Sequence, residues 1–192
     1  MALGTRFYLP STGAAAVNPA YSAWDDVSIA TRLKTVITKI SSAMTTINFT
    51  DIDATNKNIL FTQWVSDTLA AQTILAQTIN IQIRVDELLA TNNLFLTWTV
   101  KAVSQDGGTL RGTLVAIQRD GTEVDTTLTN RGDNATSTQV VTQLGDRLVF
   151  EIGLGGTPTA ATHTGDIRIG DIAASDLPQD DISTSDFNPW IL

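Results

Sequence analysis

Cysteine is absent from this chain of 192 residues, and histidine occurs once, as His163. Without cysteine the chain has no disulfides and no thiolate ligands, and a single histidine cannot supply a zinc site alone. No G-x-S-x-G motif marks an activated serine for His163 to serve. A chain of this length can bury roughly 70% of its unfolded surface, so it needs no disulfide or metal to fold. We therefore expect no metal and no cofactor.

Charge is also scarce, at 17% of the residues against roughly 25% in an average soluble domain. The net charge is −8, and Lys and Arg form no local run. Because an acidic surface repels phosphate backbones, direct nucleic-acid binding is not expected. No stretch approaches the ~20 apolar residues of a membrane span, and residues 1–6 lack the apolar core of a signal peptide. We therefore expect no membrane association.

What the chain has instead is threonine, at thirty residues, with many isoleucines and valines. Side chains branched at Cβ suit a pleated sheet better than a helix. Residues 78–85 alternate between apolar and polar, and residues 94–102 repeat the pattern, with Trp98 on the apolar side. Apolar residues at every second position over eight residues indicate a half-buried strand.

Turn residues divide the rest of the chain into short segments. Asp106-Gly107-Gly108 and Asp120-Gly121 are typical of hairpin turns. Short strands at regular spacing predict an all-β sandwich or barrel, and we favour a jelly-roll-like antiparallel β-sandwich over residues 31–172. One or two helical turns near residues 27–37 are the only alternative to strand. The further expected segments are strands at 36–40, 59–65, 112–118, 123–128, 140–141, 147–152 and 163–169, a polar loop at 129–138 and a loop opening at 153–156.

Both ends of the chain depart from this pattern and are expected to be extended arms. Residues 1–30 contain two prolines and no periodicity, and residues 173–192 are rich in Asp, Ser and Pro. Aromatic residues concentrate in both arms, although they make up only 6% of the chain. They either fold back on the protein's own core or anchor the arms on a neighbouring subunit. The candidate interface residues are Phe7, Tyr8, Tyr21, Trp24, Phe187 and Trp190.

No residue pattern indicates a catalytic site. His163 lies between threonines, where we expect an exposed loop residue at the start of a strand. The pair Asp51 and Asp53 lacks the glycine and the distal glutamate of a calcium-binding EF-hand. Gly153 to Gly156 offers no phosphate-binding lysine and leads into no helix. The other acidic pairs, Asp25-Asp26, Asp86-Glu87 and Asp180-Asp181, and the tripeptide Arg131-Gly132-Asp133 are interpreted as solvated loop or strand-end residues.

Several stretches resemble structural proteins encoded by tailed bacteriophages. The opening Arg6 to Gly13, with Pro19 and Trp24, looks like the N-terminal signature of that group. Together the stretches cover nearly the whole chain, and none is a catalytic motif. The other stretches that are similar to the group are Arg111 to Leu114 after the Asp106-Gly107-Gly108 turn, Gly145 to Gly153, Gly165 to Asp171 and Asn188 to Ile191.

The resemblance implies a non-enzymatic component of a phage virion, located in the assembled particle. The acidic β-fold with arms fits a capsid decoration or cement protein best, which would bind the major capsid protein or another virion protein. By analogy with such proteins we expect a homo-oligomer, with a trimer as the first guess. Because the chain is larger than small decoration proteins, a tail, neck, baseplate or head-fibre position is the alternative. A carbohydrate-binding module for host adsorption, with Trp64 or Trp98 stacking on sugar, is a third.

Overall fold

The computed structural model describes residues 4–27, 32–51, 55–156, 162–170 and 189–192. Every regular element in these ranges is a strand, which confirms the predicted all-β class. The strands are β1 (Phe7–Tyr8), β2 (Asp26–Val27), β3 (Leu33–Lys34), β4 (Thr45–Asp51), β5 (Lys57–Val65), β6 (Gln72–Ile74), β7 (Thr78–Glu87), β8 (Leu94–Val103), β9 (Leu110–Arg119), β10 (Thr129–Thr136), β11 (Val140–Thr142), β12 (Arg147–Gly156), β13 (His163–Ile169) and β14 (Trp190–Ile191).

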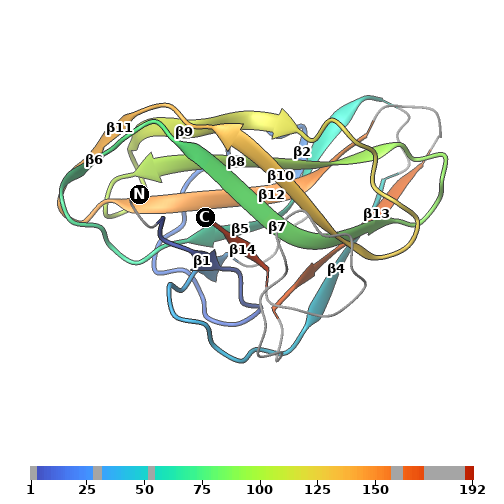
Figure 1. Ribbon diagram of the computed structural model, residues 1–192, viewed down its shortest axis with the longest axis horizontal. Helices are drawn as coiled ribbons and strands as arrows, with labels where there is room; N and C mark the ends of the chain where they lie inside the picture. The colour runs from blue at the N-terminus through green and yellow to red at the C-terminus, as the bar shows by residue number, and fades with distance from the viewer. Residues whose placement is uncertain (1–3, 28–31, 52–54, 157–161, 171–188) are drawn as a thin grey trace.

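Two six-stranded sheets pack face to face as a sandwich. The first sheet has the order β1-β14-β7-β13-β4, with β10 on the other side of β7. The second has the order β2-β5-β12-β8-β9, with β3 also beside β5. In Figure 1 strands β7 and β10 cross in front of β8 and β12. Only β2 and β3 pair in parallel, both with β5, so the predicted antiparallel sandwich is confirmed.

The core lies between the sheets and follows the predicted alternation. Ile81, Ile83 and Val85 of β7 are fully buried and face the second sheet. From β8, Leu96 and Trp98 enter the same cluster. Side chains of successive strand residues point to opposite faces, so the alternation identified the side of β7 and β8 that faces the core. The predicted half-buried state is wrong, because polar residues on the opposite side, such as Gln82 and Thr97, are buried as well.

Two segments predicted as loops are strands. Residues 129–138 contain β10, which pairs with β7 along its length. Residues 153–156 belong to β12, beside β5 and β8. A Cβ on Gly153 would lie 1.8 Å from the carbonyl oxygen of Ile59, so this glycine permits close backbone packing at a bulge and makes no turn. The strands predicted at 36–40 and 123–128 do not form. Within residues 27–37, where helical turns were the alternative to strand, Leu33–Lys34 forms β3.

The described parts of both arms contribute strands to the sandwich. Near the N-terminus β1 pairs with β14, and β2 extends the second sheet. The short strand β14 in turn pairs with β7. Strands β1 and β14, near the two ends of the chain, therefore lie side by side, as Figure 1 shows. The segment between β1 and β2 crosses the outer face of the second sheet, and we call its residues 19–24 the strap.

Candidate interaction surfaces

Phe7, Tyr21 and Trp190 of the arms pack against other parts of the same chain. The ring of Phe7 is 5.1 Å from that of Phe150, and Arg6 stacks over Trp190 at 3.9 Å. Trp190 has no exposed surface, so it cannot contact a partner in this state. Tyr21 lies beneath the guanidinium of Arg32. The structure thus shows the fold-back arrangement for these three rings.

The remaining candidates are only partly accessible or are outside the described residues. Tyr8 and Trp24 are half-buried, and the Trp24 indole donates to Glu151. Phe187 lies outside the described residues. Since Tyr8, Tyr21 and Trp24 keep some exposed surface, their contact with a partner stays a prediction.

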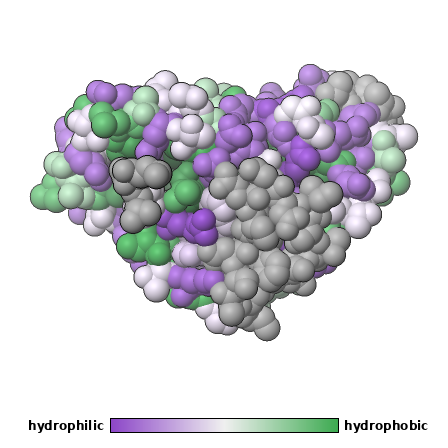
Figure 2. All heavy atoms as spheres, in the orientation of Figure 1, coloured by the Kyte–Doolittle hydropathy of each residue, from purple (hydrophilic) through white to green (hydrophobic). Residues whose placement is uncertain are grey.

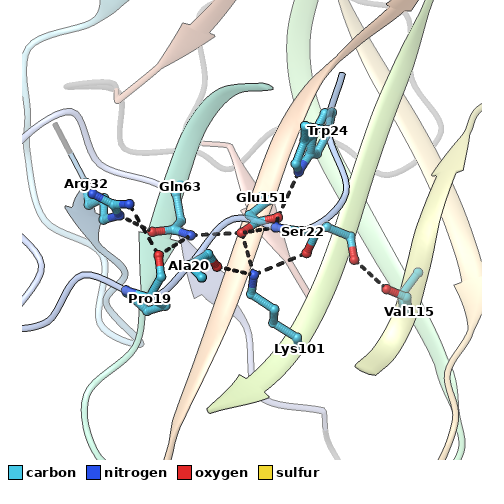
Figure 3. Close-up of polar contacts among 10 residues, drawn as sticks. Pro19, Ala20, Ser22, Trp24, Arg32, Gln63, Lys101, Val115 and Glu151 are labelled. Atoms are coloured by element: carbon cyan, nitrogen blue, oxygen red, sulfur yellow. Dashed lines mark hydrogen bonds and ion pairs between the residues drawn. The ribbon is translucent and has the colours of Figure 1, made fainter. Parts of the chain in front are cut away.

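The strap is held by a buried polar cluster around Glu151 of β12 (Figure 3). Glu151 has no exposed surface and accepts a hydrogen bond from the Lys101 ammonium at 2.7 Å and one from Gln63 at 2.8 Å. The strap adds the backbone N–H of Ser22 at 3.0 Å and the indole N–H of Trp24 at 2.8 Å. Lys101 also donates to the Ala20 carbonyl. The cluster therefore joins β5, β8 and β12 to the N-terminal segment.

The two charged groups of this cluster, Glu151 and Lys101, neutralise each other through a buried ion pair. Burial alone would raise the pKa of Glu151, but the Lys101 ammonium and the hydrogen bonds from Trp24 and Gln63 outweigh it and hold the pKa below its ordinary value. A carboxylate that is saturated with donors and shielded from solvent is poorly placed to accept a substrate proton. The role of the cluster is therefore structural: it holds the strap against the second sheet.

A second group of charges forms a square on the outer face of the first sheet. Asp86 of β7 lies directly opposite Asp166 of β13, and Arg84 lies opposite Arg168. Burial raises the pKa of Asp86 to about 6, with repulsion from Asp166 adding to it, while Arg168 and Arg84 act in the other direction. Like charges directly opposite one another destabilise a sheet, and the two neighbouring arginines compensate for the repulsion between Asp86 and Asp166 only in part.

Replacing Asp86 with asparagine is expected to stabilise the fold at neutral pH. Because the folded pKa is raised from 3.8 to about 6, the penalty of the buried charge is complete above pH 6 and absent below 3.8. Asp86→Asn should therefore raise the free energy of unfolding by about 2–3 kcal/mol at pH 7.5. Urea titrations at pH 7.5 and pH 4 measure both values. A variant that is less stable than the wild type at pH 7.5 would contradict the prediction.

His163 is buried, which contradicts the exposed loop position predicted from the sequence. Its side chain is 1% exposed at the start of β13. The physical reason is Gly156, where a Cβ would lie 2.4 Å from the imidazole ring, so the glycine leaves the space that the ring fills. Asp51 is 3.8 Å from Nδ1 and pairs with Lys57 at 2.7 Å. Within the described part of the chain, no serine or threonine hydroxyl is hydrogen-bonded to His163.

The other sequence candidates for chemistry form no metal site in the described ranges, and Asp86 and Glu87, which were predicted to be solvated, are buried. No group of three or more metal-binding side chains occurs there, and Asp53 of the considered calcium pair lies outside them. Arg131-Gly132-Asp133 lies in β10, where Asp133 accepts a hydrogen bond from the Trp98 indole at 2.6 Å. No helix in the described part is long and apolar enough to span a membrane.

Both tryptophans considered for sugar stacking are buried. Trp64 and Trp98 have no exposed surface, which confirms the core position predicted for Trp98. The Trp64 indole donates to the Pro10 carbonyl at 3.1 Å. With no ring face accessible, neither residue can stack on a sugar.

Four aliphatic side chains are exposed together at one end of the sandwich. We call Leu75, Leu110, Val141 and Leu144 the end patch; their exposed fractions are 65%, 59%, 63% and 80%. Three neighbouring strands carry or border them, since β6 pairs with β11 and β11 packs beside β9. Figure 2 shows hydrophobic side chains at this end, where Figure 1 places β6, β9 and β11. Leu144 also borders a shallow, mainly polar groove.

The end patch was not predicted from the sequence. Leu144 sits alone in a turn between Gln143 and Gly145, and Leu75 follows the end of β6. Isolated aliphatic residues outside an alternating run carry little signal, and only the fold brings these four together. Exposed apolar groups of this kind are typical of protein–protein contacts.

Comparison with known proteins supports the fold. No protein-family profile matches the sequence, and no curated protein matches it. The structure is similar to part of a CocE/NonD family hydrolase from Staphylococcus aureus, with a TM-score of 0.55 and 9% identity over 97% of this chain. The match covers 35% of that protein, so this chain spans about a third of its length. At this identity the likeness shows the fold alone.

Two other solved structures are much less similar. They are the structure of infectious bursal disease virus strain Gx (TM-score 0.25, 12% identity, covering 91% of this chain and 39% of the other) and the VP2 subviral particle of that virus (TM-score 0.20, 12% identity, covering 91% and 44%). Their TM-scores are too low to carry an argument.

Proposed function

We propose that this chain is a non-enzymatic virion structural protein of a tailed bacteriophage, which decorates or cements the capsid by binding other protein surfaces. The observation that carries the binding role is the end patch, where four aliphatic residues are exposed at one end of the sandwich. The assignment to a phage particle rests on the sequence resemblance.

The polar chemistry of the described residues also favours a structural role. The buried Glu151–Lys101 pair fastens the strap, and Asp51, Lys57 and His163 lie together at one end of β4 and β13. A hydrolase of the serine class needs a nucleophile hydrogen-bonded to its base, and no described serine or threonine hydroxyl is hydrogen-bonded to His163. The raised pKa of Asp86 is explained by its burial and by the Asp166 carboxylate opposite it.

The partner we propose is the major capsid protein. Contacts repeated over a capsid lattice add to high avidity even when each is weak, which suits a patch of only four residues. A tail, neck, baseplate or head-fibre position remains the second candidate within the same class, and it predicts few copies per particle. The low charge and the hydroxyl-rich surface fit either position.

Charged substitutions in the end patch should abolish attachment to the particle. Val141→Glu with Leu144→Glu places two carboxylates where we expect an apolar contact, so binding to particles assembled without the chain should fall at least tenfold. Because both side chains are exposed, the melting temperature should change little. Cosedimentation with purified particles measures the binding.

A matched control separates the patch from a general effect of added charge. Leu88→Glu with Leu89→Glu makes the same chemical change at exposed leucines beyond the other end of β7. This variant should bind like the wild type. Equal binding by both double variants and the wild type would contradict the role of the end patch, and absence of any binding would contradict the proposed partner.

A further inference from the structure

The strand β4 ends the first sheet with one edge unpaired among the described residues. Its residues Thr45–Asp51 pair with β13 on one side only, and no described strand lies beside the other edge. In an antiparallel ladder every second residue directs its N–H and C=O groups away from the neighbouring strand. The outer edge of β4 therefore presents backbone groups that can pair with an added strand.

The composition of β4 lacks the usual protection of an exposed edge. Edge strands are commonly blocked by Lys, Pro, a bulge or an inward charge. β4 contains Thr, Ile, Asn and Phe, pairs with β13 without a register shift, and has one charged residue, Asp51, at its end. Ile47 and Phe49 point inward but are only half-buried, although Phe49 packs on Phe61 at 5.7 Å. A neighbouring strand would cover both side chains.

We propose that two copies of this chain pair antiparallel through their β4 edges, around a twofold axis at Asn48. This pairing places Ile47 of one copy opposite Phe49 of the other, so that inward faces meet inward faces and the two cores join. Thr46 lies opposite Thr50 on the outer face. The two Asp51 residues lie at opposite ends of the new ladder, each opposite Thr45, and no like charges meet. The strand is thus complementary to itself.

This inference extends the proposed function from binding a particle to binding a second copy, and it uses no residue of the end patch. A twofold pair also replaces the trimer expected from analogy. Seven residues per strand bury less than the roughly 1,200 Å² of a stable complex, so the isolated dimer should be weak. Each copy carries a net charge of −8, so its association should be measured in about 0.5 M salt, where repulsion is screened.

Because the chain contains no cysteine, a single introduced cysteine can form a disulfide only with its counterpart in a second copy. Asn48→Cys puts two thiols directly opposite at the twofold axis, where Cα atoms of paired strands are ~4.5–5.5 Å apart and a disulfide can close. Under mild oxidation this variant should form a covalent dimer at least ten times faster than Leu144→Cys, whose side chain lies in the end patch. A rate for Asn48→Cys no faster than that of Leu144→Cys would overturn the proposal.

Charge pairs on the exposed face test the register. In the proposed dimer Thr46→Glu with Thr50→Lys sets each glutamate opposite a lysine, whereas Thr46→Glu with Thr50→Glu sets glutamate opposite glutamate. Sedimentation equilibrium should show wild-type or tighter dimers for the first variant and at least tenfold weaker dimers for the second. Both variants carry the same Thr46→Glu change beside Arg168 of their own copy, so their folds are matched. Equal association of the two variants, or a wild-type chain that is a monomer or a trimer, would overturn the pairing.

Discussion

Replacing Lys101 with methionine should lower the free energy of unfolding by about 3–5 kcal/mol at pH 7. The substitution leaves Glu151 as an unpaired charge with no access to solvent, and removing one partner of a buried ion pair has an effect of this size. Lys101 also holds the Ala20 carbonyl of the strap, so the strap should loosen with it. Urea unfolding monitored by tryptophan fluorescence measures the loss.

The matched control is Lys34→Met, which removes an exposed ion pair with Asp67. Surface pairs of this kind contribute about 0–1 kcal/mol, so the control should stay close to the wild type. The double substitution Lys101→Met with Glu151→Leu should recover much of the lost stability, because no buried charge remains. Equal, small losses for Lys101→Met and Lys34→Met would contradict the role assigned to the buried cluster.

The pH dependence of the wild type follows from the depressed pKa of Glu151. An acid whose folded pKa lies below its unfolded value of 4.5 stabilises the fold fully above pH 4.5. This contribution is lost as the pH falls through the lower, folded pKa. In Lys101→Met the unpaired carboxyl instead favours protonation, so the gap between variant and wild type should narrow as the pH is lowered from 7 towards 4.

Gly153→Ala should prevent folding of the sandwich. A Cβ at this position would lie 1.8 Å from the Ile59 carbonyl oxygen and 3.0 Å from the Leu60 Cα, both of which belong to the backbone of β5. Neither atom can move without separating β12 from β5 at the centre of the second sheet. We expect a loss of more than about 4 kcal/mol, the range of severe packing or strain defects. Circular dichroism and solubility of the purified variant provide the measurement.

Gly121→Ala is the control for this substitution. No heavy atom lies within 4 Å of the position its Cβ would occupy, so the stability should be unchanged within about 0.5 kcal/mol. A Gly153→Ala variant that folds as stably as Gly121→Ala would mean that β12 and β5 do not approach as closely as described.

The sequence was sufficient where the structural signal is local. The alternation of Ile79, Ile81 and Ile83 identified a strand and its buried face, because side-chain direction in a strand depends only on position along it. The Asp106-Gly107-Gly108 turn was also identified, and Gly107 has the positive φ of 79° that such a turn requires. These local signals together gave the all-β sandwich.

The sequence was insufficient where a residue's role depends on a distant neighbour. The glycines at 153–156 suggested a loop, yet Gly153 is needed for contact with Ile59 and Gly156 for space beside His163. The buried position of His163 follows from that space and cannot be inferred from the threonines around it. Likewise the partners of Glu151 come from residues as distant as Trp24, so only the fold reveals the cluster that fastens the strap.

The candidate binding surfaces show the same division. Aromatic residues in the arms were a reasonable prediction of an interface, since composition alone cannot distinguish a ring that contacts a partner from one that packs on its own core. Trp190 proves to be buried. The end patch was missed because Leu144 lies in a turn, outside any alternating run.

The most direct test of the binding role is the reactivity of a single cysteine in place of Leu144, measured in the free chain and in purified particles. The account predicts that a bulky maleimide labels Leu144→Cys readily in the free chain and at least tenfold more slowly in particles. Leu89→Cys, at an exposed leucine away from the end patch, should react equally in both. Equal labelling of Leu144→Cys in the free chain and in particles, or particles that contain none of the chain, would contradict it.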